Sequence, residues 1–387
     1  MQQDSEFPAH IPTLIDSADD LEAWIHQKLT VCLQSRDWHD LIQTRPTQAE
    51  TIRSAQARLT RQVFQHPPNP YNCHLLDGVE QEILQQLYED CFNLNRNGHH
   101  LPESQSEAWE QFWQHWHRAN QLRWVDIHRS QGSFSLYCSP LEMTETLQHI
   151  WARQPVVLVG GALDLEKSAP IYRHNIGLED VTCVKFSPDR QNQLIQLYLP
   201  SGLPLPNTPR FHAALMEAIR TLLWTSTGAS NSNQLTVLLI DDLPLKAQMG
   251  ASLAAEFGSR VKVETLDLAA DSILVTGWQF WQSMQGKLPC PHLLAIATLP
   301  LPSLENPLVA GQVSHYKQQR QDWFRLYLLP TALNQLQRAI APVRETQGVV
   351  ALFDGRVLHR SYGQQVLAAL SPFARVHYLD TIWFDRI

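Results

Sequence analysis

The stretch LTVLLIDDLPLKAQMGASL, residues 235–253, decides the fold class. Its first six residues are apolar apart from one threonine, which is typical of a strand buried on both faces. Two aspartates and a proline then interrupt the run, and small and apolar residues follow at helical spacing. A buried strand that leads directly into a helix is the unit from which mostly parallel α/β sheets are built.

The same alternation recurs from about residue 131 to the C-terminus. Helical segments, including a long one from about 306 to 341, separate the strand-like runs. The other runs are SFSLYC, PVVLVGG, VTCVKF, LIQLYLP, VKVETL, SILVTG, HLLAIATLP, GVVALFD and RVHYLD. We therefore expect residues 131–387 to form an α/β domain with a mostly parallel sheet and right-handed crossovers.

Residues 26–130 differ in texture, being rich in Gln, His and Trp, and they predict a mainly helical domain. Four aromatic residues recur there at i, i+3, i+4 and i+7, namely Trp109, Phe112, Trp113 and Trp116. We interpret this stripe as a core face. The alternative is a platform for stacking bases, but the neighbouring side chains are mainly Gln, Glu and His rather than the Lys and Arg that usually accompany such platforms.

Composition excludes some classes of protein. With 387 residues, 44% of them hydrophobic, the chain is long enough for two or three domains. A formal charge of −8 argues against a protein that coats nucleic acid by bulk electrostatics, although a local basic groove stays open. The apolar runs are shorter than the roughly 20 residues of a membrane span. The N-terminus resembles neither a signal nor a transit peptide, and we expect a cytoplasmic protein.

The six cysteines are scattered, without a CxxC pair, and we expect buried, reduced thiols. They are Cys32, Cys73, Cys91, Cys138, Cys183 and Cys290. No other residue pattern predicts a metal site.

Read in order, several segments resemble the second motor domain of the XPD/DinG branch of superfamily-two DNA helicases. VVLVGGALDLEKSAPIYRHNIGL stands where that family has T-S-A-T-L and a following GL, and LPSGLPLPNTPRFHAAL resembles its P-x-x-L-P-x-x-N-x-P entry to a helix. VTGWQFWQSMQG resembles G-T-x-S-F-W-E-G-x-D, and ATLPLPSLENPL resembles DKLPFPSPDDPL. YLLPTALNQLQRAIAPVRETQGVVALFDGRVLHRSYG resembles the family's last motif. The likeness implies a RecA-like sheet domain.

The stretch LIDSADDLEAW resembles the IIDEAHNLE box at the end of that family's first motor domain. The resemblance implies that residues 1–25 are a remnant of this domain and that its phosphate loop lies outside the chain. Asp16 keeps the magnesium-type carboxylate, whereas Ser17 and Asp19 replace the glutamate and the histidine. A hydroxyl does not serve as a general base at neutral pH without help. The alternative is that DSADD simply caps the next helix.

The arginine-finger motif is also degenerate. Gln337 keeps its glutamine and Arg344 its second arginine, but Ala341 replaces the first arginine. Arg338 and Ile340 replace its glycines, Pro342 is expected to bend or end the helix, and Gln282 and Ser283 replace the Glu and Gly of SFWEG. In GALDLEKS, residues 161–168, Glu166 replaces the second glycine of a phosphate loop and would repel phosphates. Loss of one finger arginine costs roughly 10³-fold or more in rate.

We therefore expect a catalytically degenerate relative of these helicases that does not hydrolyse ATP alone, so that the catalytic remnants are Asp16, Gln337 and Arg344. One hypothesis is a module that binds DNA or RNA or assists a motor, and another is a pseudo-enzyme scaffold for a protein partner. A third is an ATP-dependent DNA helicase whose ATP and Mg²⁺ site a partner subunit completes. The candidates for phosphate contacts, which could equally be solvated cations, are Lys317, Arg320, Arg325, Arg338, Arg356 and Arg360.

Overall fold

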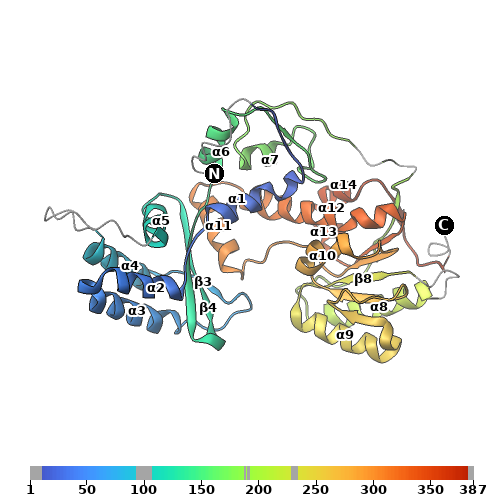
Figure 1. Ribbon diagram of the computed structural model, residues 1–387. Coiled ribbons are helices and arrows are strands. Elements are labelled where there is room, and N and C mark those ends of the chain that lie inside the picture. Colours follow the sequence, from blue (N-terminus) through green and yellow to red (C-terminus); the bar gives the residue numbers. More distant parts are fainter. Residues whose placement is uncertain (1–10, 93–106, 187–188, 190–191, 228–233, 382–387) are drawn as a thin grey trace. The chain divides into compact units, whose positions relative to one another are not determined.

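The computed structural model describes residues 11–92, 107–186, 189, 192–227 and 234–381, and its chain divides into two compact units (Figure 1). The first unit comprises Met1–Val159, Ile171–Val181 and Pro302–Tyr327, and the second Gly160–Pro170, Thr182–Leu301 and Leu328–Ile387. Both units are discontinuous in sequence. The boundary predicted near residue 130 lies inside the first unit, so the predicted segments and the compact units divide the chain differently.

The second unit contains a seven-stranded sheet in which every pair of neighbours is parallel, in the order β13-β7-β12-β11-β8-β10-β9. Its strands are β7 (Ile195–Tyr198), β8 (Thr236–Leu239), β9 (Val261–Val263), β10 (Ile273–Thr276), β11 (Leu293–Ile296), β12 (Val349–Leu352) and β13 (Phe373–Val376). All residues of the four central strands β8, β10, β11 and β12 are buried. The parallel α/β sheet predicted from residues 235–253 is confirmed.

Helices cover both faces of this sheet (Figure 1). On one face lie α8 (Phe211–Thr227) and α9 (Leu243–Phe257), and on the other lie α10 (Trp278–Met284), α12 (Leu329–Glu345), α13 (Arg356–His359) and α14 (Gly363–Leu370). The helix α9 begins where predicted, because the Asp242 carboxylate accepts the amide of Leu245 at 2.7 Å as an N-cap. Met249 and Leu253 then pack with Val275 in the core.

The first unit contains a four-stranded antiparallel sheet in the order β2-β5-β4-β3. Its strands are β2 (Val31–Leu33), β3 (Cys73–Leu75), β4 (Gln121–His128) and β5 (Ser133–Pro140), and its helices include α2 (Ser35–Thr44), α3 (Ala49–Val63), α4 (Gly78–Cys91) and α5 (Glu107–Trp116). The predicted helical region therefore also holds strands. SFSLYC was assigned to the parallel sheet, and that assignment is wrong because the segment forms β5 here.

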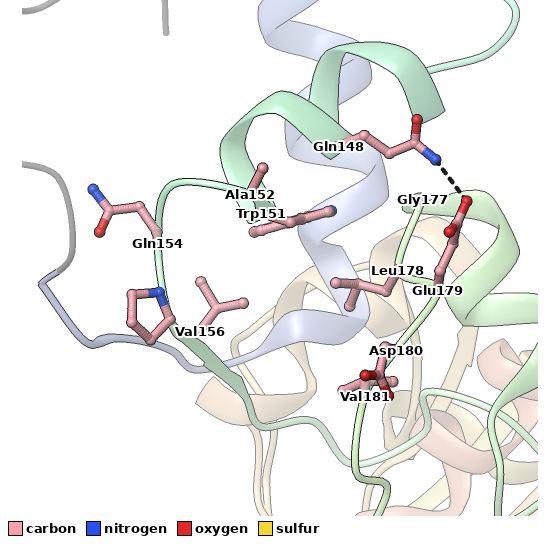
Figure 2. Close-up of a pocket in the computed structure, with 11 residues that line it drawn as sticks. Gln148, Trp151, Ala152, Gln154, Val156, Gly177, Leu178, Glu179, Asp180 and Val181 are labelled. Carbon is pink, nitrogen blue, oxygen red and sulfur yellow. Dashed lines mark hydrogen bonds between the residues drawn. The ribbon is translucent and has the colours of Figure 1, made fainter.

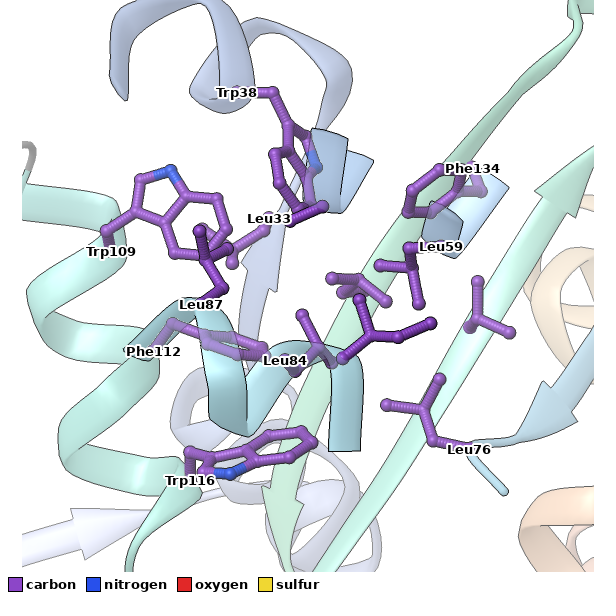
Figure 3. Close-up of a cluster of buried hydrophobic side chains, with 14 of the residues drawn as sticks. Leu33, Trp38, Leu59, Leu76, Leu84, Leu87, Trp109, Phe112, Trp116 and Phe134 are labelled. Atoms are coloured by element: carbon purple, nitrogen blue, oxygen red, sulfur yellow. The ribbon is translucent and has the colours of Figure 1, made fainter. Parts of the chain in front are cut away.

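The aromatic stripe on α5 lies in the core between these helices and the antiparallel sheet (Figure 3). Trp109, Phe112, Trp113 and Trp116 are at most 5% exposed. The indole N–H of Trp109 donates to the Asp37 carbonyl oxygen at 2.9 Å, which satisfies its buried polar atom. The core interpretation is confirmed, and these rings are not available to stack on bases.

The first unit also contains β1 (Thr13–Ile15), α1 (Leu21–Leu29), α6 (Thr144–Trp151), β6 (Val156–Leu158), α11 (Pro307–Gln318) and most of α7 (Pro170–Asn175). The predicted continuous helix from about 306 to 341 is wrong. The helix α11 ends at Gln318, Arg320 adopts a left-handed φ of 57°, and a π-helix (Phe324–Leu328) leads into α12. The predicted strand VTCVKF is also wrong, because residues 181–186 form no strand.

Two further predictions concern surfaces. None of the helices in the described ranges combines the length and apolarity needed to cross a membrane. All six cysteines are free thiols, but Cys183 and Cys290 are exposed and Cys32 is only half-buried, so the expectation of burial is wrong for the first two and holds only in part for Cys32. Both lie outside regular elements, where no apolar periodicity controls burial.

Candidate functional site

Asp16 follows β1, which pairs in parallel with β6 so that Ile15 lies opposite Leu158. The Asp16 side chain is exposed, and its Oδ1 accepts the amide of Ser17 at 2.8 Å. Ser17 adopts a left-handed φ of 55°. Ser17 and Asp20 occupy N-cap positions, but neither side chain accepts a first-turn amide, so this part of the capping interpretation is wrong for these two residues. The structure leaves one exposed carboxylate, with a serine at the position of the family's glutamate.

Arg344 lies in the last turn of α12, where it is 8% exposed. Its Nη1 donates to the carbonyl oxygens of Gln193 and Pro372, both at 3.0 Å. Its Nη2 donates to those of Leu370 at 2.7 Å and Ser371 at 3.0 Å. Burial lowers the pKa of this guanidinium. The side chain is therefore held by four backbone carbonyl groups.

These carbonyl groups place Arg344 on the amino edge of the seven-stranded sheet. Gln193 lies two residues before β7, and Pro372 directly precedes β13. In open parallel α/β sheets, ligands bind at the opposite edge, beyond the carboxyl ends of the strands. Arg344, to which the sequence assigned a finger role, thus joins the segments that precede β7 and β13.

The other remnants of the finger motif lie along α12. Gln337 and Arg338 are half-buried, and Ala339 accepts the indole N–H of Trp281 at 3.2 Å, which joins α10 to α12. The helix continues through Pro342 to Glu345, so of the two expected effects, a bend or an end, the end is wrong. The surrounding packing keeps the helix intact despite the missing amide.

The carboxyl edge of the sheet is acidic. Asp241, Asp242, Glu264 and Asp354 come within three residues of the ends of β8, β9 and β12. Among the three residues that follow each of the seven strands, none is a lysine or an arginine. These carboxylates disfavour the phosphates that such edges commonly bind, except where nearby cations neutralise them.

A polar cluster around the buried Lys246 at this edge is not predicted from the sequence. Lys246, 8% exposed, donates from Nζ to Oε1 of Glu264 at 2.5 Å, and the amide of Gly277 donates to the same oxygen at 3.2 Å. Burial raises the pKa of Asp241 nearby. Although burial opposes ionisation of Glu264, its hydrogen bonds to Lys246 and Gly277 lower its pKa. Glu264 thus already neutralises the ammonium of Lys246. In the sequence, the only sign of this cluster is an acidic residue that directly follows a strand-like run.

Arg356 has a structural partner. Asp354, 1% exposed, accepts the amide of Leu299 at 2.8 Å and that of Arg356 at 3.0 Å. The guanidinium of Arg356 contacts both carboxylate oxygens, with Nε at 2.9 and 3.0 Å. Burial would lower the pKa of Arg356, but the ion pair raises it. Arg360, in contrast, is exposed at the end of α13.

The remaining predicted cations lie in the first unit, at the end of α11 and in the turn after it. Lys317, Arg320 and Arg325 are exposed. The ammonium of Lys317 lies 5.4 Å from the centroid of the Trp323 ring. The predicted phosphate-contacting set is therefore divided, with these three cations in the first unit and Arg338, Arg356 and Arg360 in the second.

The segment GALDLEKS does not form a phosphate loop. Lys185 donates from Nζ to the carbonyl oxygens of Asp164 at 2.9 Å and Leu165 at 2.5 Å. The next helix, α7, begins only at Pro170 and is six residues long. The carbonyl groups of the loop thus face a cation, whereas a phosphate loop presents amides to an anion.

A cavity of about 580 Å³ opens in the first unit beside α6 (Figure 2). Its polar lining includes Gln148, which donates to Glu179 at 3.3 Å, and Asp180. No lysine or arginine lines it. Gly177 takes a left-handed φ of 67°, and a Cβ there would lie 2.8 Å from the Thr144 carbonyl oxygen, so the family's GL turn keeps its glycine for a steric reason.

Known proteins share this architecture. Residues 250–373 match the family model described as helicase C-terminal domain. ATP-dependent DNA helicase YoaA from Escherichia coli is 21% identical over 252 residues, which cover 62% of this chain and 40% of YoaA. YoaA from Haemophilus influenzae is also 21% identical, over 64% of this chain and 40% of that protein. The chain thus spans less than half the length of these curated relatives.

Solved structures agree on the fold. An XPD helicase aligns with a TM-score of 0.51 and 14% identity, covering 94% of this chain and 68% of that one. Xpd4 from S. tokodaii aligns with a TM-score of 0.53 and 12% identity, covering 94% and 75%. The predicted resemblance to DinG/XPD-type helicases and the RecA-like fold are confirmed.

Proposed function

Because the chain is related to the DinG/XPD-type superfamily-two helicases, we propose that it is a nucleic-acid-binding or motor-accessory module that does not hydrolyse ATP by itself. ATP and Mg²⁺ would act on it only where a partner completes the site. The proposal rests first on Arg344. A finger arginine must reach the developing charge on the terminal phosphate, whereas this guanidinium is held by four carbonyl groups at the amino edge of the sheet.

The acidic carboxyl edge supports the same conclusion. Phosphoryl transfer requires cations and backbone amides aimed at the β- and γ-phosphates. The ammonium of Lys246 is paired with Glu264, and Arg356 is paired with Asp354. Neither cation is free to neutralise a triphosphate, and freeing Arg356 would leave the buried Asp354 carboxylate unpaired.

The nucleic-acid part of the proposal rests on Lys317, Arg320 and Arg325, which are exposed in a chain that is otherwise acidic. The test is a salt titration of binding to a labelled single-stranded oligonucleotide, with ATP hydrolysis measured in the same reactions. We expect affinity to fall steeply with salt, and each Lys or Arg→Ala change in this segment to lower the slope by about 0.7. A salt-independent affinity would refute nucleic-acid binding by this surface.

A second candidate, a scaffold or motor half completed by a protein partner, is favoured by the two-stranded sheet. Leu14 and Val157 lie opposite each other in β1 and β6, and they are 68% and 56% exposed. Parallel sheets are normally covered on both faces, and two strands alone are marginal. A stable protein complex that forms without nucleic acid, and that L14S/V157S disrupts, would support this candidate.

A further inference from the structure

The turn after α11 is built to hold one aromatic ring beside a cation. Arg320 takes a left-handed φ of 57°, its amide donates to the Lys317 carbonyl oxygen at 3.0 Å, and the Gln321 amide donates to that of Tyr316 at 2.9 Å. This doubled pattern is a Schellman-type helix end. It reverses the chain and brings Trp323 back to Lys317, six residues earlier.

The turn is anchored on both sides. Before it, His315 is 6% exposed, and its Nε2 lies 2.7 Å from Oε1 of Glu142. Tyr316 stacks on Tyr327, beyond the turn, with centroids 6.0 Å apart and planes at 17°. Asp322 accepts the amide of Arg325 at 3.1 Å. The exposed part of the segment is therefore presented by a fixed base.

The charges of the segment favour an anion. Lys317 and Arg320 form no ion pair within the part of the chain that the structure describes. Arg325 lies 3.7 Å from Asp322, but both side chains are more than half exposed, so this pair is weak. Three cations thus lie beside two carboxylates, Asp322 and Glu142, and the segment keeps a net positive charge in a protein whose formal charge is −8.

We propose that Lys317, Arg320, Trp323 and Arg325 form a binding platform for single-stranded nucleic acid, in which one base stacks on the Trp323 indole and the cations contact the flanking phosphates. The inference rests on the proposed nucleic-acid binding and names the residues and the strand state. Trp323 is half-exposed, and the Lys317 ammonium over its ring lies within reach of the phosphate of a stacked nucleotide. A stacked indole accepts any base, so the platform is selective for unpaired strands rather than for sequence.

The experiment measures the affinity of the whole chain for a fluorescently labelled 20-nucleotide oligo-dT by anisotropy, with a duplex of equal length as competitor. Trp323→Ala is expected to weaken oligo-dT binding about 5- to 150-fold without changing the salt slope, and Trp323→Phe to lose less. Lys317→Ala is expected to lower the slope by about 0.7. Trp24→Ala is the matched control, because Trp24 is an exposed tryptophan (47%) on another helix of the same unit.

Two results would overturn the inference, and they differ in what else they affect. If the wild-type chain binds oligo-dT but Trp323→Ala and Trp323→Phe bind it as tightly as Trp24→Ala does, the stacking platform is refuted and the proposed function stands. If the wild-type chain does not bind oligo-dT at low salt, the proposed nucleic-acid binding fails as well. Equal affinity for the duplex would refute selectivity for unpaired strands. Thermal unfolding of each variant separates lost binding from lost folding.

Discussion

Replacement of Arg344 distinguishes a structural arginine from a catalytic one. In the fold, Arg344 donates to four carbonyl groups, and the bonds to Leu370 and Pro372 are fully buried. Arg344→Ala leaves these two carbonyl groups buried without a hydrogen-bond donor, which lowers the free energy of unfolding by about 1–3 kcal/mol for each group. Water can reach the other two, at Gln193 and Ser371, where the bonds are only partly buried.

The expected loss is therefore roughly 4 kcal/mol for the second unit, or about 8–16 °C in its melting temperature. Arg344→Lys keeps the charge but not the planar fork, and we expect a smaller loss. The assay is guanidinium unfolding followed by circular dichroism, with Arg360→Ala as the control, because that exposed arginine of the same unit should change stability by less than about 0.5 kcal/mol. If Arg344→Ala unfolds at the same denaturant concentration as Arg360→Ala, the Arg344 guanidinium does not hold these carbonyl groups, and the reasoning is refuted.

Other changes follow from the same contacts. Arg356→Ala should lower the free energy of unfolding by about 2–4 kcal/mol, because it leaves the Asp354 carboxylate, which is 1% exposed, without its partner. The salt slope of DNA binding should stay unchanged, and an altered slope would contradict the structural role of Arg356. Trp109→Ala should cost about 3–5 kcal/mol in denaturant unfolding, since this ring is completely buried, and a loss below about 1 kcal/mol would place the ring elsewhere. Burial opposes ionisation of Glu142, but its hydrogen bonds to His315 and Gln319 lower its pKa. Ionised Glu142 therefore stabilises the fold above about pH 4.3, and this contribution is lost as the pH falls below that value. Glu142→Gln should flatten this acid limb of a pH–stability profile, and an unchanged limb would show that the pair does not contribute.

The sequence predicts the second unit best, because its four central strands are buried along their whole length and each is followed by a helix. The run at Thr236–Leu239 and the cap at Asp242 carry both signals within a few residues. The antiparallel sheet was missed, because two of its strands are only three residues long and leave no visible alternation. The break after Gln318 was missed because helical periodicity continues on both sides of a turn that depends on the left-handed Arg320.

The candidate site was harder to predict than the fold. The motif departures at Ser17 and Ala341 are visible in the chain, and they indicated lost chemistry. The role of Arg344 is not visible, because its partners are backbone carbonyl groups up to 151 residues away. The pairing of Lys246 with Glu264 likewise requires β8 and β9 to be placed on either side of β10 before the residues meet.

The central claim is that this polypeptide alone cannot aim water at a terminal phosphate. The most direct measurement is the rate of phosphate release from Mg²⁺-ATP by the purified chain, with and without saturating single-stranded DNA. We predict a rate no higher than that of the buffer under both conditions. DNA-stimulated turnover that follows the chain through purification, and that Asp16→Asn abolishes while the fold is retained, would contradict it.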